Sequence, residues 1–302
     1  MTISFWKHHP ISDQHGQTLA HEAIDFQNKF HFDFLKLTPA GDWLAVCYGA
    51  EDEVWENDAV GRRKITGFPL KEIKDFYQLQ AFTFQEKLLV EIIQALEICC
   101  RAVSVPVYAT IFCPLSQLIQ IAGLDLFLKV AQIEPEAILA ALAVINQNTL
   151  SVIETAAMKG VKGLYYVTQH MQTDLLSPDL YQQFGKPSDE HCLLKAAEVF
   201  DSIIFHLHGH DCYTCIAKDI PKLRLHCTFN SSIKNSMEET GYPIIYGLPA
   251  STLQQTNTEQ ECHDILKKFP HNLLLTCDCV LPIAFPDEQI SLWNKAIRSL
   301  EC

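Results

Sequence analysis

Short apolar runs rich in β-branched and aromatic residues alternate along the chain with longer segments of helical periodicity. The runs predict eight strands, at residues 32–37, 43–48, 105–111, 163–167, 202–206, 223–227, 243–246 and 272–276. Apolar positions spaced three and four apart predict helices at residues 18–30, 84–103, 135–159, 188–200, 231–240, 258–269 and 287–300. Residues 51–80 are polar and irregular, so we interpret them as an excursion from this alternation.

Continuously apolar strands that alternate with helices indicate a parallel sheet covered on both faces. Eight such strands predict an α/β protein with a single (β/α)8 TIM barrel. A doubly wound open sheet is the alternative, but no glycine-rich phosphate loop follows the first strand. No linker or internal repeat interrupts the chain, so we expect one domain over residues 1–302. Catalytic residues are then expected where the strands end.

The composition narrows the possible partners. Hydrophobic residues make up 48% and charged residues 20%, which indicates a soluble globular protein and excludes a disordered or fibrous one. The formal net charge is −13, which disfavours nucleic acid and predicts a small-molecule substrate. The N-terminus lacks an apolar signal core, and no uncharged apolar run reaches membrane-spanning length, so we expect a cytoplasmic protein without a membrane anchor. The 12 cysteines are then expected to be reduced, and most of them to pack in the core.

One group of residues has the chemistry of a metal site. His206 and His208 stand at the end of the fifth predicted strand, and alternate residues of an extended chain point to the same side. Cys279 follows the last strand, and Cys277 is its substitute if the register differs by two residues. Two imidazoles and a thiolate form a three-ligand zinc site with an open fourth position. The alternative is a polar pocket beside packed cysteines.

Other polar residues lie where the barrel mouth is expected. Lys36 is a charge within an apolar strand and is either a snorkelling side chain or a pocket cation. We predict catalytic roles for Lys36 and Gln169. We predict substrate-binding roles for His8, His9 and Gln120.

The sequence resembles the uroporphyrinogen decarboxylase superfamily, which also contains zinc-dependent corrinoid:thiol methyltransferases. The resemblance rests on the order and spacing of several short motifs. These are FWKHHP at 5–10, DFLK at 33–36, GLYYVTQ at 163–169, IFHLHG at 204–209, and Cys279 followed seven residues later by Pro286. It implies a (β/α)8 barrel from Phe5 to about Leu300.

Within this superfamily, the decarboxylases carry an arginine-rich motif near the N-terminus, whereas residues 5–30 contain no arginine. The resemblance places their pyrrole-binding Asp near Ala40, their pocket Tyr near Gln120, their pocket Ser at Gln169 and their C-terminal His at Cys279. All four of these side chains are therefore replaced.

The methyltransferase branch binds zinc through a His-x-Cys after the fifth strand and a late Cys. His206 and Cys279 match two of these ligands, and His208 replaces the middle Cys, which changes the charge of the site by one unit. In that branch, zinc holds a thiol as a thiolate that accepts a methyl group from a corrinoid on a partner protein.

The leading hypothesis is therefore a zinc enzyme that transfers a methyl group to a thiol, with His206, His208 and Cys279 as ligands. The second hypothesis is decarboxylation of uroporphyrinogen or a related acid, as in porphyrin biosynthesis, with Lys36, His8 and His9 as the cations. A metal-dependent hydrolase that uses Asp278 with the two histidines, and a non-catalytic ligand-binding barrel, are the remaining alternatives.

Overall fold

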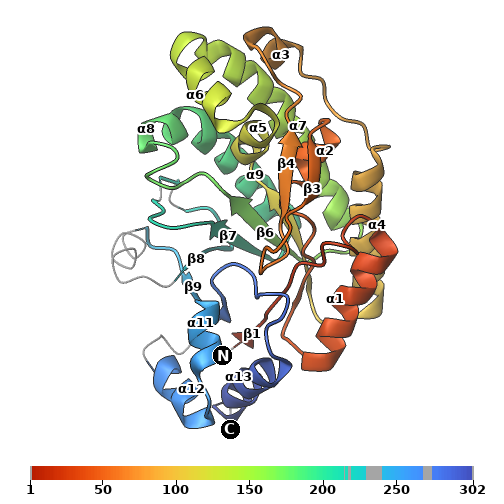
Figure 1. Ribbon diagram of the computed structural model, residues 1–302, viewed down its shortest axis with the longest axis vertical. Coiled ribbons are helices and arrows are strands. Elements are labelled where there is room, and N and C mark those ends of the chain that lie inside the picture. Colours follow the sequence, from red (N-terminus) through yellow and green to blue (C-terminus); the bar gives the residue numbers. More distant parts are fainter. Residues whose placement is uncertain (1, 214, 217–218, 229–239, 268–273, 301–302) are drawn as a thin grey trace.

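A computed structural model describes residues 2–300 except 214, 217–218, 229–239 and 268–273. Eight parallel strands form one sheet in the order β1-β10-β9-β8-β7-β6-β5-β2. Their bounds are β1 Thr2–Ile3, β2 Leu35–Lys36, β5 Val107–Phe112, β6 Gly163–Thr168, β7 Ser202–Leu207, β8 Leu223–Thr228, β9 Ile244–Leu248 and β10 Leu274–Cys277. Helices surround these strands (Figure 1), and the fold is that of an α/β TIM barrel, as the sequence predicts.

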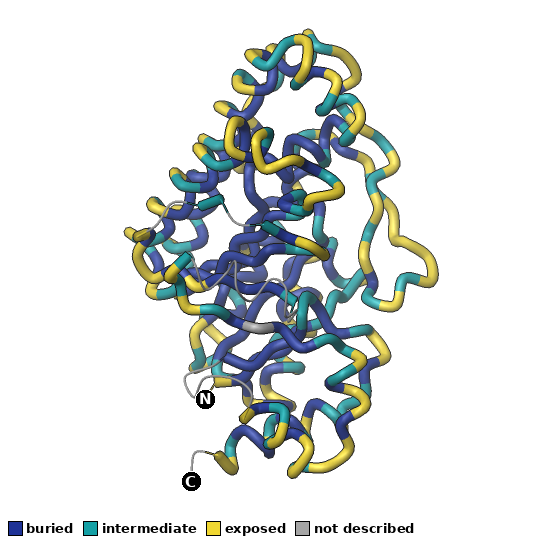
Figure 2. Tube along the Cα trace, turned by 90° about the vertical axis from the view of Figure 1, so that its left-hand side faces the viewer, coloured by how far each residue is buried: buried dark blue, intermediate teal, exposed yellow. Residues whose placement is uncertain are grey.

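Most of the chain between the strands is helical. The helices are α1 Gly16–Phe30, α2 Trp43–Cys47, α3 Ile73–Gln78, α4 Lys87–Ala102, α5 Pro114–Ala122, α6 Leu124–Ile133, α7 Pro135–Met158, α8 Pro178–Leu180, the π-helix η1 Tyr181–Gly185, α9 Lys186–Val199, α11 Ala250–Gln255, α12 Glu259–Leu266 and α13 Asp287–Ser299. The strands run through the buried interior, and the exposed residues lie along the outer helices (Figure 2). The predicted helix at 231–240 and the start of the last predicted strand fall on residues outside those described.

Two expectations about the strands were wrong. Residues 43–48, predicted as a strand, form α2, because the short apolar run buries Trp43, Leu44 and Cys47 on a single turn and a half of helix. With residues 43–48 helical, the eighth strand of the sheet is β1, which the sequence pattern did not predict. It is only two residues long and pairs in parallel with β10. The Asp33 N–H donates to the Ile3 carbonyl at 3.0 Å, which joins β1 to the chain entering β2 and brings the two ends of the sheet together.

The excursion at residues 51–80 contains ordered structure. Strands β3 (Glu51–Val54) and β4 (Arg63–Gly67) form an antiparallel hairpin, which α3 follows. Gly61 has a φ of +74° in its turn, and a Cβ there would lie 2.6 Å from the Ile283 side chain. The Ile283 N–H donates to the Ala59 carbonyl at 2.9 Å. These contacts fix the hairpin turn against the loop after β10, at the mouth of the barrel.

Helix α7 has the length and apolar composition of a membrane-spanning helix. However, 56% of its most apolar stretch is buried inside the fold. It packs against α5, α6 and α9, as a core helix of the outer layer does.

Candidate metal centre and active site

The end of β7 brings two histidines to the mouth of the barrel. His206 lies on β7 and His208 follows the strand, so extended geometry turns both rings to the same side. Their ring centroids are 5.8 Å apart. The His208 N–H donates to the Thr168 carbonyl at 3.0 Å, which holds the chain beside β6 after the strand has ended.

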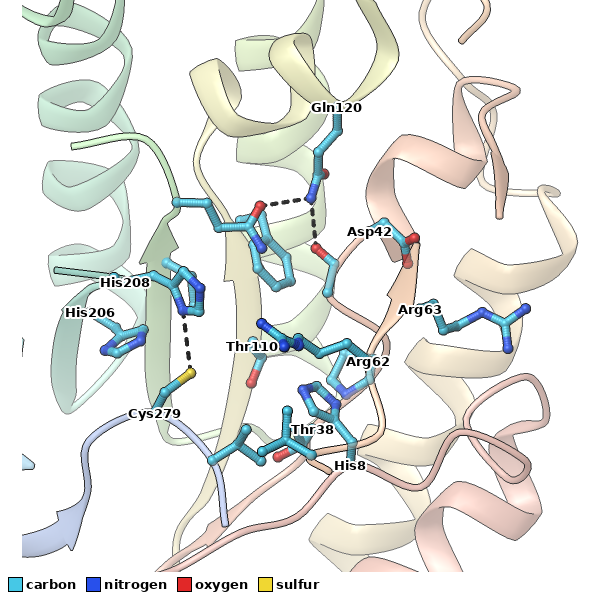
Figure 3. Close-up of a pocket in the computed structure, with 18 of the residues that line it drawn as sticks. His8, Thr38, Asp42, Arg62, Arg63, Thr110, Gln120, His206, His208 and Cys279 are labelled. Atoms are coloured by element: carbon cyan, nitrogen blue, oxygen red, sulfur yellow. Dashed lines mark hydrogen bonds between the residues drawn. The ribbon is translucent and has the colours of Figure 1, made fainter. Parts of the chain in front are cut away.

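The turn after β10 supplies the thiol. The Cys279 N–H donates to the Asp278 carboxylate at 2.9 Å, and the Trp6 indole N–H donates to the Cys279 carbonyl. The Cys279 sulfur lies 3.3 Å from the Nδ1 atom of His208 (Figure 3). Cys277 is fully buried at the end of β10, and it is absent from the cavity lining that contains Cys279. The geometry thus places Cys279, rather than its substitute, in the cluster.

One potential ligand atom from each of His206, His208 and Cys279 lies within 4.8 Å of the others. Neither ring nitrogen of His206 makes a hydrogen bond within the described part of the chain, although the side chain is 2% exposed. A buried imidazole without partners is costly, and a metal ion would use its lone pair. Two imidazoles and one sulfur suit zinc. Asp278, the carboxylate of the hydrolase alternative, is not part of this group.

Burial determines the charge of these side chains. It lowers the pKa of His208 to about 4 and that of His206 well below its usual range, so both rings are neutral, as metal ligands must be. Burial also raises the pKa of the Cys279 thiol to about 12, although Lys36 and Arg62 oppose this shift. Without a cation the cluster therefore holds a protonated thiol, and binding of a metal ion would release that proton.

Lys36 projects from the end of β2 into the same cavity. Its ammonium lies 4.8 Å from the ring of Trp6 and 4.4 Å from that of Tyr165, and it donates to the Thr38 hydroxyl at 3.1 Å. Burial lowers its pKa to about 7, and Cys279 acts in the opposite direction. The structure therefore places the Lys36 amine in the cavity between two aromatic faces, and not in solvent.

A further buried histidine, His226, contacts the cluster without belonging to it. His226 on β8 pairs in register with His206, and their ring centroids are 4.7 Å apart. His226 Nε2 lies 3.1 Å from the Cys277 carbonyl, which only an N–H can satisfy, so Nδ1 is the acceptor for the Tyr165 hydroxyl at 2.8 Å. Tyr165 in turn stacks on the His206 ring. Sequence reasoning gave neither His226 nor Tyr165 a role at this cluster.

These groups surround a cavity of about 650 Å³, a size suited to a small-molecule ligand. Gln120 and Gln169 line it together, and Gln120 Nε2 donates to Gln169 Oε1 at 2.7 Å (Figure 3). His8 also lines it, and its buried Nδ1 makes no hydrogen bond within the described residues. His9 lies outside the lining, with its Nδ1 3.7 Å from the Glu22 carboxylate. The other predicted residues, His206, His208, Cys279 and Lys36, share this cavity.

Several lining residues come from segments that the sequence pattern did not mark. Arg62 and Arg63 belong to the hairpin, and both are paired: Arg62 donates to Asp58, and Arg63 donates to Asp52. Asp42 stands just before α2. In the sequence, only the adjacent pair Arg62-Arg63 within the irregular residues 51–80 could have indicated a contribution to the site. Such a pair does not specify which way its side chains face.

A family model described as uroporphyrinogen decarboxylase matches residues 57–297. The chain belongs to the uroporphyrinogen decarboxylase family. The match begins after Lys36 and Asp42, so these two cavity residues lie outside the matched segment. No curated protein matches the chain.

Solved structures share the fold of this family member at low sequence identity. A methyltransferase from Methanosarcina mazei superposes with a TM-score of 0.76 at 15% identity, covering 97% of this chain and 88% of that one. A B12-independent methionine synthase from Shewanella sp. W3-18-1, solved with selenomethionine, gives a TM-score of 0.55 at 10% identity, covering 93% and 87%. At such identities the likeness shows the fold alone.

Proposed function

We propose that His206, His208 and Cys279 hold a zinc ion, and that the protein transfers a methyl group from a corrinoid on a partner protein to a thiol. The observation that carries this proposal is the convergence of the three ligand atoms within 4.8 Å, together with a buried His206 ring that makes no hydrogen bond to any described residue. Zinc bound in such a site keeps a thiol in its nucleophilic thiolate form at neutral pH. Two of the fold neighbours are named for methyl-group chemistry, which is consistent with the proposal.

The residues around the cluster have distinct roles in this proposal. Lys36 in its protonated form stabilises a thiolate at the sulfur position, and its pKa of about 7 lets it gain or lose a proton near neutral pH. Trp6 and Tyr165 keep this ammonium in place and exclude water from it. Gln120, Gln169 and His8 offer hydrogen bonds to the rest of the substrate. In such a transfer the thiol would lose its proton and its sulfur would bond to the methyl carbon, while the electron pair of the broken bond would stay with the donor.

The net charge of −13 and the concave site favour a small-molecule substrate over nucleic acid, and we propose a cytoplasmic location. Decarboxylation remains the second candidate, because Lys36 and Arg62 both face the cavity. However, the Arg62 guanidinium donates to Asp58 at 2.6 Å, so Lys36 is the cavity cation that no carboxylate pairs in the described chain. A substrate with several carboxylates lacks partners there.

Thiol binding tests the proposed function. When 2-mercaptoethanol is titrated into zinc-loaded protein in two buffers of different ionisation enthalpy, calorimetry should show release of about one proton per thiol bound. Methylcobalamin should then yield the S-methyl product. Binding without proton release, or turnover of uroporphyrinogen by a metal-free preparation, would contradict the proposal.

A further inference from the structure

Asp42 is a buried carboxylate that has no hydrogen-bond partner among the described residues. It precedes α2 as the N-cap residue, and an Asp in that position usually accepts an N–H from the first turn. Here the side chain makes no capping hydrogen bond, and neither carboxylate oxygen accepts one from any other described residue. The residue is 4% exposed and lines the cavity. A buried carboxylate without a partner is costly, so this geometry calls for a ligand that supplies donors.

The surroundings of Asp42 carry an excess of negative charge. Burial is the main cause that raises the pKa of Asp42 to about 7; Asp52 and Asp13 add to this shift, and Arg63 opposes it. The Arg63 guanidinium is already engaged, because it donates to both oxygens of Asp52 and lies 3.9 Å from Asp13. The single guanidinium of Arg63 therefore offsets the charge of three carboxyl groups, and this excess of acidic groups favours binding of a further cation.

A second acceptor without a partner in the described chain lines the same cavity as Asp42. The Gln120 side-chain amide donates to the Gly41 carbonyl at 2.9 Å and to Gln169 Oε1 at 2.7 Å. Both donors of this amide are used, and its buried Oε1 has no partner among the described residues. These two cavity acceptors, Asp42 and Gln120 Oε1, would suit a group with several N–H donors and a positive charge, which a primary ammonium provides.

The opposite side of the cavity has the reverse polarity. Figure 3 shows Asp42 across the cavity from His206, His208 and Cys279. On the cluster side, the ammonium of Lys36 is bonded to the Thr38 hydroxyl and to no carboxylate in the described chain. Among the described residues, the cavity thus carries an amine without a carboxylate partner on the cluster side and a carboxyl group without a partner at its far side.

We propose that the thiol substrate is an aminothiol, whose ammonium group pairs with Asp42 and Gln120 Oε1 while its sulfur lies at the His206–His208–Cys279 cluster. This inference rests on the proposed function for the sulfur end only. The position of the ammonium group is inferred from Asp42 and Gln120 and does not depend on the proposed function.

Matched thiols test the inference by calorimetry at pH 8 on the zinc-loaded protein. The probes are ω-aminothiols of two to six carbons, ω-hydroxythiols of the same lengths, and ω-mercaptocarboxylates. In the wild type, the best aminothiol should bind at least about tenfold more tightly than the hydroxythiol of equal length. Equal affinities for the two, or tighter binding of the mercaptocarboxylate, would overturn the inference without any variant.

Substitution of Asp42 tests whether this residue causes the preference for aminothiols over hydroxythiols. Asp42→Asn should reduce the amino-to-hydroxy ratio to about one and leave hydroxythiol affinity nearly unchanged. Asp25→Asn makes the same chemical change on the exposed face of α1 and should keep the wild-type ratio. A wild-type ratio retained in Asp42→Asn would contradict the role of Asp42.

Binding of alkylammonium ions to metal-free protein separates this inference from the proposed function. If these ions bind the wild type and not Asp42→Asn, while no thiol binds the zinc-loaded protein, Asp42 is an ammonium site and the proposed function fails. If thiols bind with proton release but without preference for the amine, the proposed function stands and the ammonium site is wrong.

Discussion

At the scale of single residues, the cluster depends on side chains that contact its ligands without belonging to it. Tyr165 contacts three of the groups involved: its ring stacks on His206, its face holds the Lys36 ammonium, and its hydroxyl donates to His226. Each contact joins a different strand, so the position of the His206 ring is fixed across the barrel interior. Tyr165 is thus a positioning residue.

Tyr165→Phe separates the structural role of the hydroxyl from metal binding. The substitution keeps the ring and leaves the buried Nδ1 of His226 without its donor. We expect the free energy of unfolding to fall by about 1–3 kcal/mol, the cost of an unsatisfied buried polar atom. Chemical denaturation measures it, and the metal content should remain that of the wild type. An unchanged free energy of unfolding would show that the hydrogen bond between Tyr165 and His226 does not contribute to stability.

The residues of the cluster could be predicted from sequence because they follow simple geometric rules. Alternate positions at a strand end face the same way, and parallel strands of a barrel end at one rim, which together bring His206, His208 and Cys279 into the same region. Asp42 and Arg62 follow no such rule. They lie in a turn and a hairpin, where the direction of a side chain depends on tertiary contacts.

At the scale of elements, α2 and β1 show what periodicity cannot resolve. Residues 43–48 are an apolar run of six, which is long enough for a strand and compatible with a short helix. Tertiary packing, which buries four of the five residues of α2, decides for the helix. β1 is two residues long, too short to produce any period, and only its pairing with β10 reveals it. The two errors cancelled, so the count of eight strands was correct although one member was wrong.

A buried carboxylate links three elements behind the barrel. Asp189 on α9 accepts from Tyr166 on β6 at 2.9 Å and from Tyr181 on η1 at 2.6 Å. Burial is the main cause that raises its pKa to about 7, and the two hydroxyls only partly offset it. The folded protein therefore binds a proton that the unfolded chain releases near pH 4.

This shift predicts how stability depends on pH. A raised carboxyl pKa gives a contribution that is fully present below about pH 4 and is lost as the pH rises to about 7. Asp189→Asn removes this titration. Relative to the wild type, the free energy of unfolding of the variant should therefore be higher at pH 8 than at pH 5 by about 2–4 kcal/mol, and its melting temperature should follow. Calorimetric scans at both pH values measure the difference. A difference that does not change with pH would contradict the shift.

At the scale of the whole molecule, closure of the barrel depends on the first residues of the chain. Ile3 is fully buried on β1, between β10 and the chain entering β2. Without this strand, β2 and β10 would leave unpaired edges. The N-terminal segment also carries Trp6 and His8 into the cavity, so closure and site assembly are coupled.

Ile3→Ala tests this closure. We expect a loss of about 2–4 kcal/mol in the free energy of unfolding, because a fully buried side chain leaves a void. Ile11→Ala is the matched control, since Ile11 is 89% exposed in the same segment and should leave stability unchanged. Denaturant unfolding of both variants provides the comparison. Equal stabilities would show that β1 is dispensable.

The metal content of the purified protein tests the central proposal most directly. Wild-type protein prepared without chelator should contain about one zinc ion per chain by elemental analysis. His206→Ala and Cys279→Ser should each lose at least about nine-tenths of it. Cys100→Ser, at a half-buried position on α4, should keep it. A metal-free wild type, or zinc retained in both ligand variants, would contradict the assignment of His206, His208 and Cys279 as a zinc site.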